Sequence, residues 1–371
     1  VIALRTDRPA AALERARRAH ALDRRNPEYL NTLGIACGAC GQTEDAVAAF
    51  RRAVRERPAY ADAHCNLGIA LRRLGRLDDA TTALRRAAVL APEAVGAHLN
   101  LGKALLDAGN GEAAAASFRT GLALDPRNAE AANHLGLALQ ALGRLDEAIE
   151  SFRRAVTSDP RDADAHNNLG LALRLKGREQ EAADCFRTAL AIEPANVLAA
   201  NNLGLTLQAL GRLDESIDAL RAVVAAAPGF PDAHANLGTV LRLAGRLGEA
   251  EVALGAALAL QPRAVGALNG LGAVRLAQGR TGEAITLFEQ AIAEDPGHFD
   301  ALANLGLALL GEGRTREALS RLEACVRLRP DSAMAANNLA AVHRTRGDMR
   351  RAVECYRRAL ALDPDAIGVQ S

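Results

Sequence analysis

The residues of this chain best suited to chemistry are asparagines that recur at regular intervals. Seven stand immediately before a leucine: Asn66, Asn100, Asn168, Asn202, Asn236, Asn304 and Asn338. In three further copies the asparagine stands one place earlier: Asn31, Asn133 and Asn269. A side-chain amide both donates and accepts hydrogen bonds, so it can pair with both backbone groups of an extended peptide. Asn is also a poorer helix former than Ala by roughly half a kcal/mol, so ten of them in an Ala-rich chain require a compensating interaction.

Two kinds of interaction could compensate for this cost. In the structural interpretation, the amides bond to the neighbouring helix and fix the stacking of successive elements. In the functional interpretation, they bind a ligand, because elements about 10 Å apart meet every third residue of a strand that rises roughly 3.3 Å per residue. Such binding would be weak, because seven to ten hydrogen bonds at ~1 kcal/mol each roughly match the cost of association. It would also be blind to the sequence of the peptide, because the amides would bond to its backbone.

The cysteines and histidines form no recognisable reactive or metal-binding motif. Cys37 and Cys40 form C-x-x-C, but late in a predicted helix, whereas a redox site needs the motif at a helix N-terminus after a strand. Free thiols in helices favour a reducing compartment, so we expect a cytoplasmic location. Four histidines recur in one slot, which we expect them to fill in place of an aromatic residue: His64, His98, His166 and His234. The sequence therefore predicts no catalytic residue, no metal site and no cofactor.

A period of 34 residues positions all of these side chains. The pair Leu-Gly recurs at this spacing from Leu33-Gly34 to Leu305-Gly306, and a tenth copy, Leu339-Ala340, loses only the glycine. A second glycine follows each pair at a fixed distance, and a proline closes each unit, from Pro58 to Pro364. Three registers that repeat without an insertion indicate an array of one supersecondary unit.

Residues 129–162 show what one unit must be. Apolar residues recur at helical spacing as far as Leu142, Gly143 interrupts them, and a second apolar stripe runs on to Pro160. The unit is therefore a helix, a glycine turn and a second helix. Gly136 lies inside the first helix, where glycine costs roughly 1 kcal/mol relative to alanine, so we expect another backbone to pack against it. Phe152 is expected to fill the space between successive helix pairs.

The pattern resembles the tetratricopeptide repeat, a 34-residue helix–turn–helix with Leu-Gly, turn Gly, Ala, aromatic, Ala and Pro positions. The resemblance implies an all-α fold, a right-handed α-solenoid superhelix whose first helices line a concave groove. It divides the chain into a partial N-terminal repeat over 1–26, mainly its second helix, ten complete repeats over 27–366, and a tail over 367–371 that starts a further repeat or is truncated. The array is especially similar to that of O-linked N-acetylglucosamine transferases and Spindly-like proteins, which carry such an asparagine ladder.

Composition narrows the class of partner. The formal net charge is +1 with Arg and acidic residues interspersed, which argues against nucleic-acid binding. No apolar run approaches membrane-spanning length, which argues against membrane insertion. Basic residues that are nearly all Arg, together with abundant Ala, suggest a bacterial genome rich in G and C.

These observations predict a protein-interaction scaffold that binds an extended peptide or partner segment in its groove through the asparagine ladder. An alternative is that the chain is the substrate-recognition arm of a larger enzyme, such as a glycosyltransferase, whose catalytic domain lies outside this chain. Because both ends fall within the repeat pattern without a polar capping helix, we expect the chain to be a segment of a longer protein. The uncapped ends also allow a third hypothesis, end-to-end self-association.

Overall fold

The structure is a computed structural model that describes residues 9–363, and all regular secondary structure in this range is helical. Helices cluster into two compact units, divided between Pro194 and Ala195. The first unit contains α1 (Pro9–Leu22), α2 (Pro27–Ala39), α3 (Thr43–Glu56), α4 (Ala61–Arg73), α5 (Leu77–Leu90), α6 (Val95–Asp107), α7 (Gly111–Leu124), α8 (Ala129–Ala141), α9 (Leu145–Ser158), α10 (Ala163–Leu175) and α11 (Glu179–Ile192). The second contains α12 (Val197–Ala209), α13 (Leu213–Ala226), α14 (Pro231–Leu243), α15 (Leu247–Leu260), α16 (Val265–Ala277), α17 (Thr281–Glu294), α18 (Phe299–Gly311), α19 (Thr315–Leu328), α20 (Ala333–Thr345) and α21 (Met349–Leu362).

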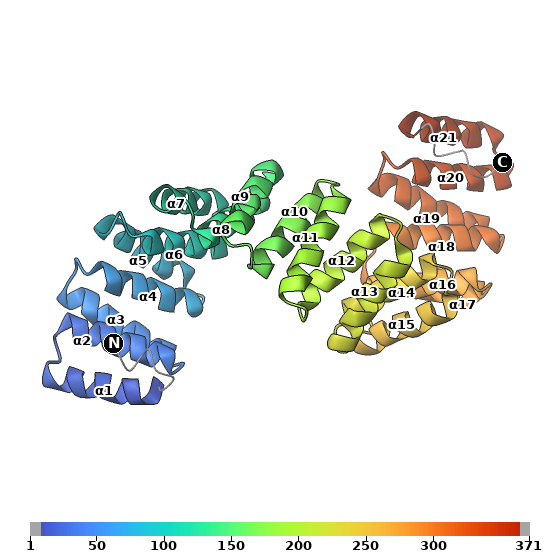
Figure 1. Cartoon of the computed structure of the whole chain (residues 1–371). Helices are drawn as coiled ribbons and strands as arrows, with labels where there is room; N and C mark the ends of the chain where they lie inside the picture. Colours follow the sequence, from blue (N-terminus) through green and yellow to red (C-terminus); the bar gives the residue numbers. More distant parts are fainter. Residues whose placement is uncertain (1–8, 364–371) are drawn as a thin grey trace. The chain divides into compact units, whose positions relative to one another are not determined.

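Within each unit, the helices pack in chain order as hairpins stacked on one another (Figure 1). Each even-numbered helix pairs with the next odd-numbered one, and each pair contacts the next pair of the same unit. The predicted all-α solenoid fold is therefore confirmed. The repeat boundaries over 27–366 stay a prediction. Helix α1 falls within the partial repeat predicted over 1–26, whereas the closing Pro364 and the predicted tail over 367–371 lie outside the described residues.

The turn between paired helices depends on a glycine in the left-handed region. Gly143 has a φ of 73°. Its N–H donates to the carbonyl of Gln140, and the Arg144 N–H donates to the carbonyl of Leu139, both at 2.9 Å. This is the Schellman arrangement, in which glycine ends a helix because it lacks the Cβ that makes a positive φ costly. The predicted role of the second glycine as the turn residue is confirmed.

The glycine inside each first helix makes room for a side chain. A Cβ built on Gly136 would lie 2.5 Å from Cε1 of Phe152, which comes from the second helix of the same hairpin. Our expectation of a neighbouring backbone was therefore wrong at this position, because the ring occupies the space. The equivalent Phe118 also stacks on His134 of the following hairpin, with ring centroids 5.6 Å apart. These large side chains fill the space between successive hairpins, as predicted.

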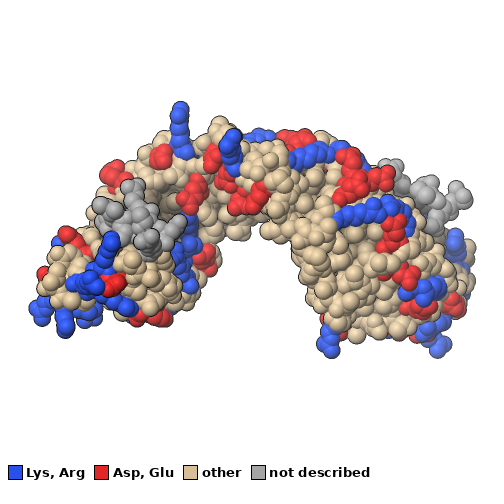
Figure 2. Space-filling view, turned by 60° about the horizontal axis from the view of Figure 1, so that its bottom comes forward, with Lys and Arg blue, Asp and Glu red and all other residues tan. Residues whose placement is uncertain are grey.

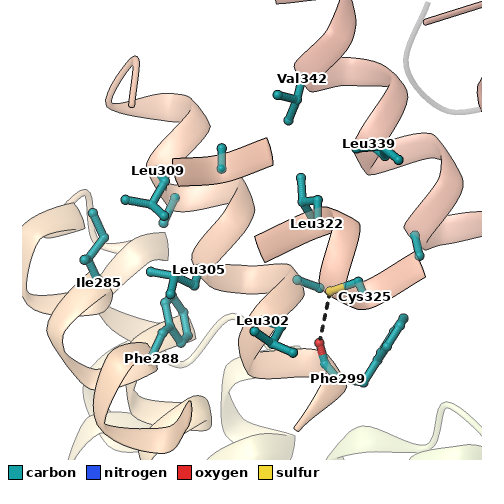
Figure 3. Close-up of a cluster of buried hydrophobic side chains, with 14 of the residues drawn as sticks. Ile285, Phe288, Phe299, Leu302, Leu305, Leu309, Leu322, Cys325, Leu339 and Val342 are labelled. Carbon is teal, nitrogen blue, oxygen red and sulfur yellow. Dashed lines mark hydrogen bonds between the residues drawn. The ribbon is translucent and has the colours of Figure 1, made fainter. Parts of the chain in front are cut away.

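A close view of the second unit shows how the core continues from one hairpin to the next (Figure 3). Phe288 from α17, Leu305 from α18, Leu322 from α19 and Val342 from α20 are all buried in one cluster. The Cys325 thiol in the same cluster lies 3.8 Å from the Phe299 carbonyl oxygen, to which it donates a weak hydrogen bond. Because each hairpin buries its apolar faces against its neighbours, stability accumulates along the stack.

Arginine–glutamate pairs link the second helices on the surface. The Arg144 guanidinium binds both carboxylate oxygens of Glu147 at 2.7 Å, at the N-terminus of α9. Arg119 of the preceding second helix reaches the same carboxylate at 3.2 Å. Each exposed ion pair contributes little to stability by itself. A carboxylate in the first turn of a helix is stabilising because it lies at the positive end of the helix dipole. On the face shown in Figure 2, basic and acidic side chains accordingly lie next to one another among broad uncharged areas.

Candidate functional site

The candidate site is the surface formed by the first helices of the hairpins, here called the first-helix face. In the N-terminal unit it consists of α2, α4, α6, α8 and α10, each in contact with the next. In the C-terminal unit it consists of α12, α14, α16, α18 and α20, which contact one another in the same way. Side-chain caps begin several of these helices. The Asn128 side chain accepts from the Ala131 N–H at 2.8 Å, and Asp162 accepts from the Ala165 N–H at 3.0 Å, which satisfies backbone donors that the helix leaves free.

All ten predicted asparagines lie in first helices. Asn31 and Asn338 are buried, with 7% and 8% of their surface exposed. The others are half-buried: Asn66, Asn100, Asn133, Asn168, Asn202, Asn236, Asn269 and Asn304. Eight amides therefore lie at the edge of the packed interior and retain contact with solvent.

Several of these amides bond to one another across successive hairpins. The Nδ2 group of Asn168 donates to Oδ1 of Asn133 at 3.1 Å, and the two residues are 35 positions apart. The same bond joins Asn66 to Asn31 at 3.0 Å, and Asn304 to the equivalent residue of the preceding hairpin at 2.9 Å. Asparagines that stand one place early are thus not substitutes for the regular position. They are acceptors for the regular asparagine of the next hairpin.

Sequence reasoning missed Asn201, which belongs to this set. Asn236 donates to Asn201 at 2.9 Å, although we had singled out its neighbour Asn202. The signal is present in the sequence as a spacing of 35 rather than 34 residues. In two hairpins the acceptor position holds Leu99 or Ala235 instead of asparagine. The residues 35 positions later are then His134 and Gly270, so the donor asparagine is absent as well.

Two regular asparagines lack an asparagine acceptor. The Nδ2 group of Asn100 donates to the Gly96 carbonyl at 2.8 Å and lies 3.8 Å from Sγ of Cys65, which occupies the acceptor position. At the other end, the buried Nδ2 of Asn338 has no hydrogen-bond partner among the described residues, and the acceptor position holds Ala303. Pairing between asparagines therefore explains only part of the conformational cost of the ladder.

The paired amides also keep unused hydrogen-bonding capacity. An amide has two N–H donors and an oxygen that accepts two bonds, whereas the Asn133–Asn168 contact uses one donor of Asn168 and one lone pair of Asn133. Both residues are half-buried and retain some exposure to solvent. The structural and the functional interpretations of the ladder are thus compatible, and the inter-hairpin bonds fix the orientation of the amides.

Charged side chains beside the amides pair with each other. Arg72 contacts Asp107 at 2.9 Å, Lys103 contacts Glu130, and Arg57 contacts Glu28 at 3.4 Å. The first two pairs join successive first helices, and the third joins α2 to the residue that follows α3 in the same hairpin. A ligand that binds here would therefore meet ion pairs with no net charge, rather than a surface of only positive or only negative side chains.

The histidines in the fourth slot have a structural role. The Nε2 atom of His98 lies 2.8 Å from the carbonyl oxygen of Pro92, in the loop before its helix, and His64 lies 3.0 Å from that of Pro58. His166 and His234 make the same contact with the prolines before their helices, at 3.2 and 2.9 Å. The ring thus anchors the loop between hairpins, beyond merely filling an aromatic slot.

The cysteines are all free thiols, and the structure gives no sign of reactivity at Cys37. Burial raises the pKa of the Cys37 thiol, the opposite of what a redox-active C-x-x-C requires. Within residues 9–363, no group of three His, Cys, Asp or Glu side chains is arranged to hold a metal ion. None of the helices in this range has the length and apolar character needed to cross a bilayer.

Comparisons with known proteins agree with this geometry. The family described as "Tetratricopeptide repeat" matches residues 39–95, 99–163, 135–197 and 201–257, with further matches of the same description at 275–342 and 333–366. A search of curated proteins finds no match.

Solved structures show the same fold. The chain is similar to a chain of the APC/C hetero-tetramer Cut9–Hcn1, with 15% identity, a TM-score of 0.56 and coverage of 98% of this chain and 92% of that one. It is also similar to yeast Tom70, with 16% identity, a TM-score of 0.52 and coverage of 97% and 89%. At these identities the likeness shows the fold alone. Together, the repeated match, the glycine turns and the stacked hairpins show that this chain belongs to the tetratricopeptide repeat family.

Proposed function

We propose that this chain is a protein-interaction scaffold that holds an extended segment of a partner protein along its first-helix faces. The observation that carries the proposal is the row of half-buried amides whose orientation is fixed by bonds such as Asn168 to Asn133. Membership of the tetratricopeptide repeat family supports a scaffold role. Side chains that are already ordered lose less entropy when a ligand binds, which increases the affinity available from each hydrogen bond.

The ladder by itself sets a general, backbone-directed affinity. Each amide contributes about 1 kcal/mol net to a bound peptide, and association costs at least ~4 kcal/mol. Binding through amides is blind to the peptide's side chains, because every residue presents the same backbone groups. Selectivity must therefore come from side chains between and beside the asparagines.

The proposal is tested with the full chain and a library of displayed peptides. A peptide selected on the wild-type protein is labelled with a fluorophore, and its Kd is measured by anisotropy. Changing Asn168, Asn202 and Asn236 to Ala is expected to weaken binding by about tenfold or more, the equivalent of one to two hydrogen bonds. The control is Gln290→Ala, which removes an exposed amide from the second helix α17.

The two interpretations of the ladder give different results in this experiment. Loss of affinity with unchanged circular dichroism, and with no more than the small destabilisation expected from the lost inter-hairpin bonds, supports peptide binding. A triple variant that melts much earlier but keeps its peptide would show that the amides serve stacking only.

One alternative, which rests only on the resemblance of the sequence pattern to O-linked N-acetylglucosamine transferase arrays, is a substrate-recognition arm of a larger enzyme. Catalysis would then reside outside this chain, and the full reading frame decides between the two: a downstream nucleotide-sugar-binding domain would favour the enzyme. End-to-end self-association, exclusion of nucleic acid, a cytoplasmic location and a bacterial source remain predictions from the sequence. Light scattering over a concentration series tests the first of these.

A further inference from the structure

The first-helix face of the N-terminal unit contains a cleft between α2, α3 and α4, with a volume of about 290 Å³. Ile35 and Ile69 line it together with Ala46 and Phe50 of α3, and the last two are buried. Its remaining lining residues are Gly34, Gly38, Ala39, Thr43, Asn66, Ala70 and Arg73. A space of this size is at the lower limit of small-ligand pockets, roughly 300 Å³, and suits one large side chain rather than a whole cofactor.

The cleft exists because Gly38 has no side chain. In the other repeats this position holds a larger residue: Arg72, Leu106, Gln140, Arg174, Gln208, Arg242, Leu276, Leu310 and Arg344. A Cβ built on Gly38 would meet only Cβ of Ala46, at 3.9 Å, which is an ordinary contact. This differs from Gly34, whose missing Cβ is replaced by the Phe50 ring at 2.5 Å. Glycine at position 38 is thus not required by packing, and it leaves the space open.

The walls of the cleft are apolar and partly exposed to solvent. Ile35 has 38% of its surface exposed, so it presents apolar surface to the cleft's opening. Because burying apolar surface is favourable, a ligand that covers Ile35 and reaches Phe50 gains affinity from the hydrophobic effect. The cleft therefore selects an apolar side chain.

Two polar groups border this apolar space. Asn66 lines the cleft and donates through Nδ2 to Asn31 at 3.0 Å, a bond that leaves its oxygen with acceptor capacity for a peptide N–H. Arg73 is exposed, and its guanidinium has no ion-pair or hydrogen-bond partner among residues 9–363. Arg72 beside it is already paired with Asp107. The free positive charge next to an apolar space complements a carboxylate that adjoins an apolar side chain.

We propose that this cleft anchors one large aliphatic or aromatic side chain of an extended peptide, with an Asp or Glu next to it that pairs with Arg73. The inference rests on the proposed function, since the peptide backbone would lie along the asparagine ladder and pair with Asn66. The cleft would distinguish between partner sequences, which hydrogen bonds from the ladder to a peptide backbone cannot do.

The test uses three short fluorescein-labelled peptides with the same Ser/Ala background and a central Phe-Asp, Phe-Lys or Ala-Asp. Their affinities for the full chain are measured by fluorescence anisotropy. The Phe-Asp peptide is expected to bind about tenfold or more tighter than Ala-Asp, as burial of one large side chain predicts. It is also expected to bind tighter than Phe-Lys, by a margin that shrinks at high salt.

The key variant is Gly38→Leu, which fills the cleft with a residue that three other repeats carry at this position. It is expected to lower the affinity for Phe-Asp by about tenfold and to leave Ala-Asp unchanged. The matched control is Gly255→Leu, at an exposed helical glycine in α15 with open space around it. If Gly38→Leu does not fold, Arg73→Glu provides the second test, because it should reverse the preference between Phe-Asp and Phe-Lys.

The outcomes separate this inference from the proposed function. Equal binding of all three peptides, with loss of each in the Asn168, Asn202 and Asn236 triple variant, would overturn the anchor and leave the ladder intact. Failure of Phe-Asp to bind, or an unchanged affinity in Gly38→Leu, also overturns it. A Phe-dependent affinity that Gly38→Leu removes and Gly255→Leu preserves supports it.

Discussion

The bond between Asn133 and Asn168 gives a quantitative test of how the hairpins are held together. Its loss costs about 1 kcal/mol, while each Asn→Ala change favours the helix by roughly 0.5 kcal/mol. Each single variant, Asn133→Ala or Asn168→Ala, should therefore destabilise its helix by ~0.5 kcal/mol. The double variant loses the bond only once and gains helix propensity twice, so its stability should be near that of the wild type. The interaction energy between the two sites is then about 1 kcal/mol.

Native-state amide hydrogen exchange of α8 and α10 in the full chain is the appropriate measurement. A long repeat array does not unfold as one cooperative unit, so a single global unfolding energy would not report on this pair. Exchange from individual helices gives local opening free energies instead. As a control, the pair Asn66 and Asn133 belongs to different bonds, and changes there should add within about 0.3–0.5 kcal/mol.

Additive effects at Asn133 and Asn168 would refute this reasoning. An interaction energy below about 0.3 kcal/mol would mean that the bond contributes nothing beyond solvation of the separate amides. The conformational cost of the asparagines would then have no structural compensation, and ligand binding would have to account for all of it.

Three further predictions concern packing, turn geometry and the thiols. Gly136→Ala should destabilise α8 by up to ~2 kcal/mol, because its Cβ would meet the Phe152 ring at 2.5 Å. Gly255→Ala lies in open space and should stabilise α15 by up to ~1 kcal/mol, and native-state hydrogen exchange of the two helices compares these effects. Gly143→Ala should cost about 1–2 kcal/mol, since φ is 73°, and faster hydrogen exchange at the end of α8 would show it. Burial raises the pKa of the Cys185 thiol to about 11, so alkylation by iodoacetamide should stay slow at pH 8 and increase only toward pH 11. Because the pKa of the Cys185 thiol is higher in the folded chain than in the unfolded chain, the melting temperature should fall as pH rises from about 9 to about 11. Rapid alkylation of the folded protein at pH 8 would contradict the raised pKa.

The sequence by itself determined the repeat, the helices and the turns. Gly143 could be recognised as a turn residue because a positive φ is a local requirement that glycine meets at least cost. The spacing of the apolar residues predicted the helices, because this spacing depends on the geometry of a single helix and not on the elements that pack against it. The position of the asparagines on the first helices followed from the same periodicity.

Only the tertiary structure decided which side chains face each other. The ring of Phe152, rather than a backbone, occupies the space at Gly136, because the crossing of two helices sets the depth of each contact. Asn168 meets Asn133 rather than the residue one period before it, because adjacent first helices are offset by one position. The cleft at Gly38 likewise arises from three helices at once, and a pattern read along one chain does not contain the distances between them.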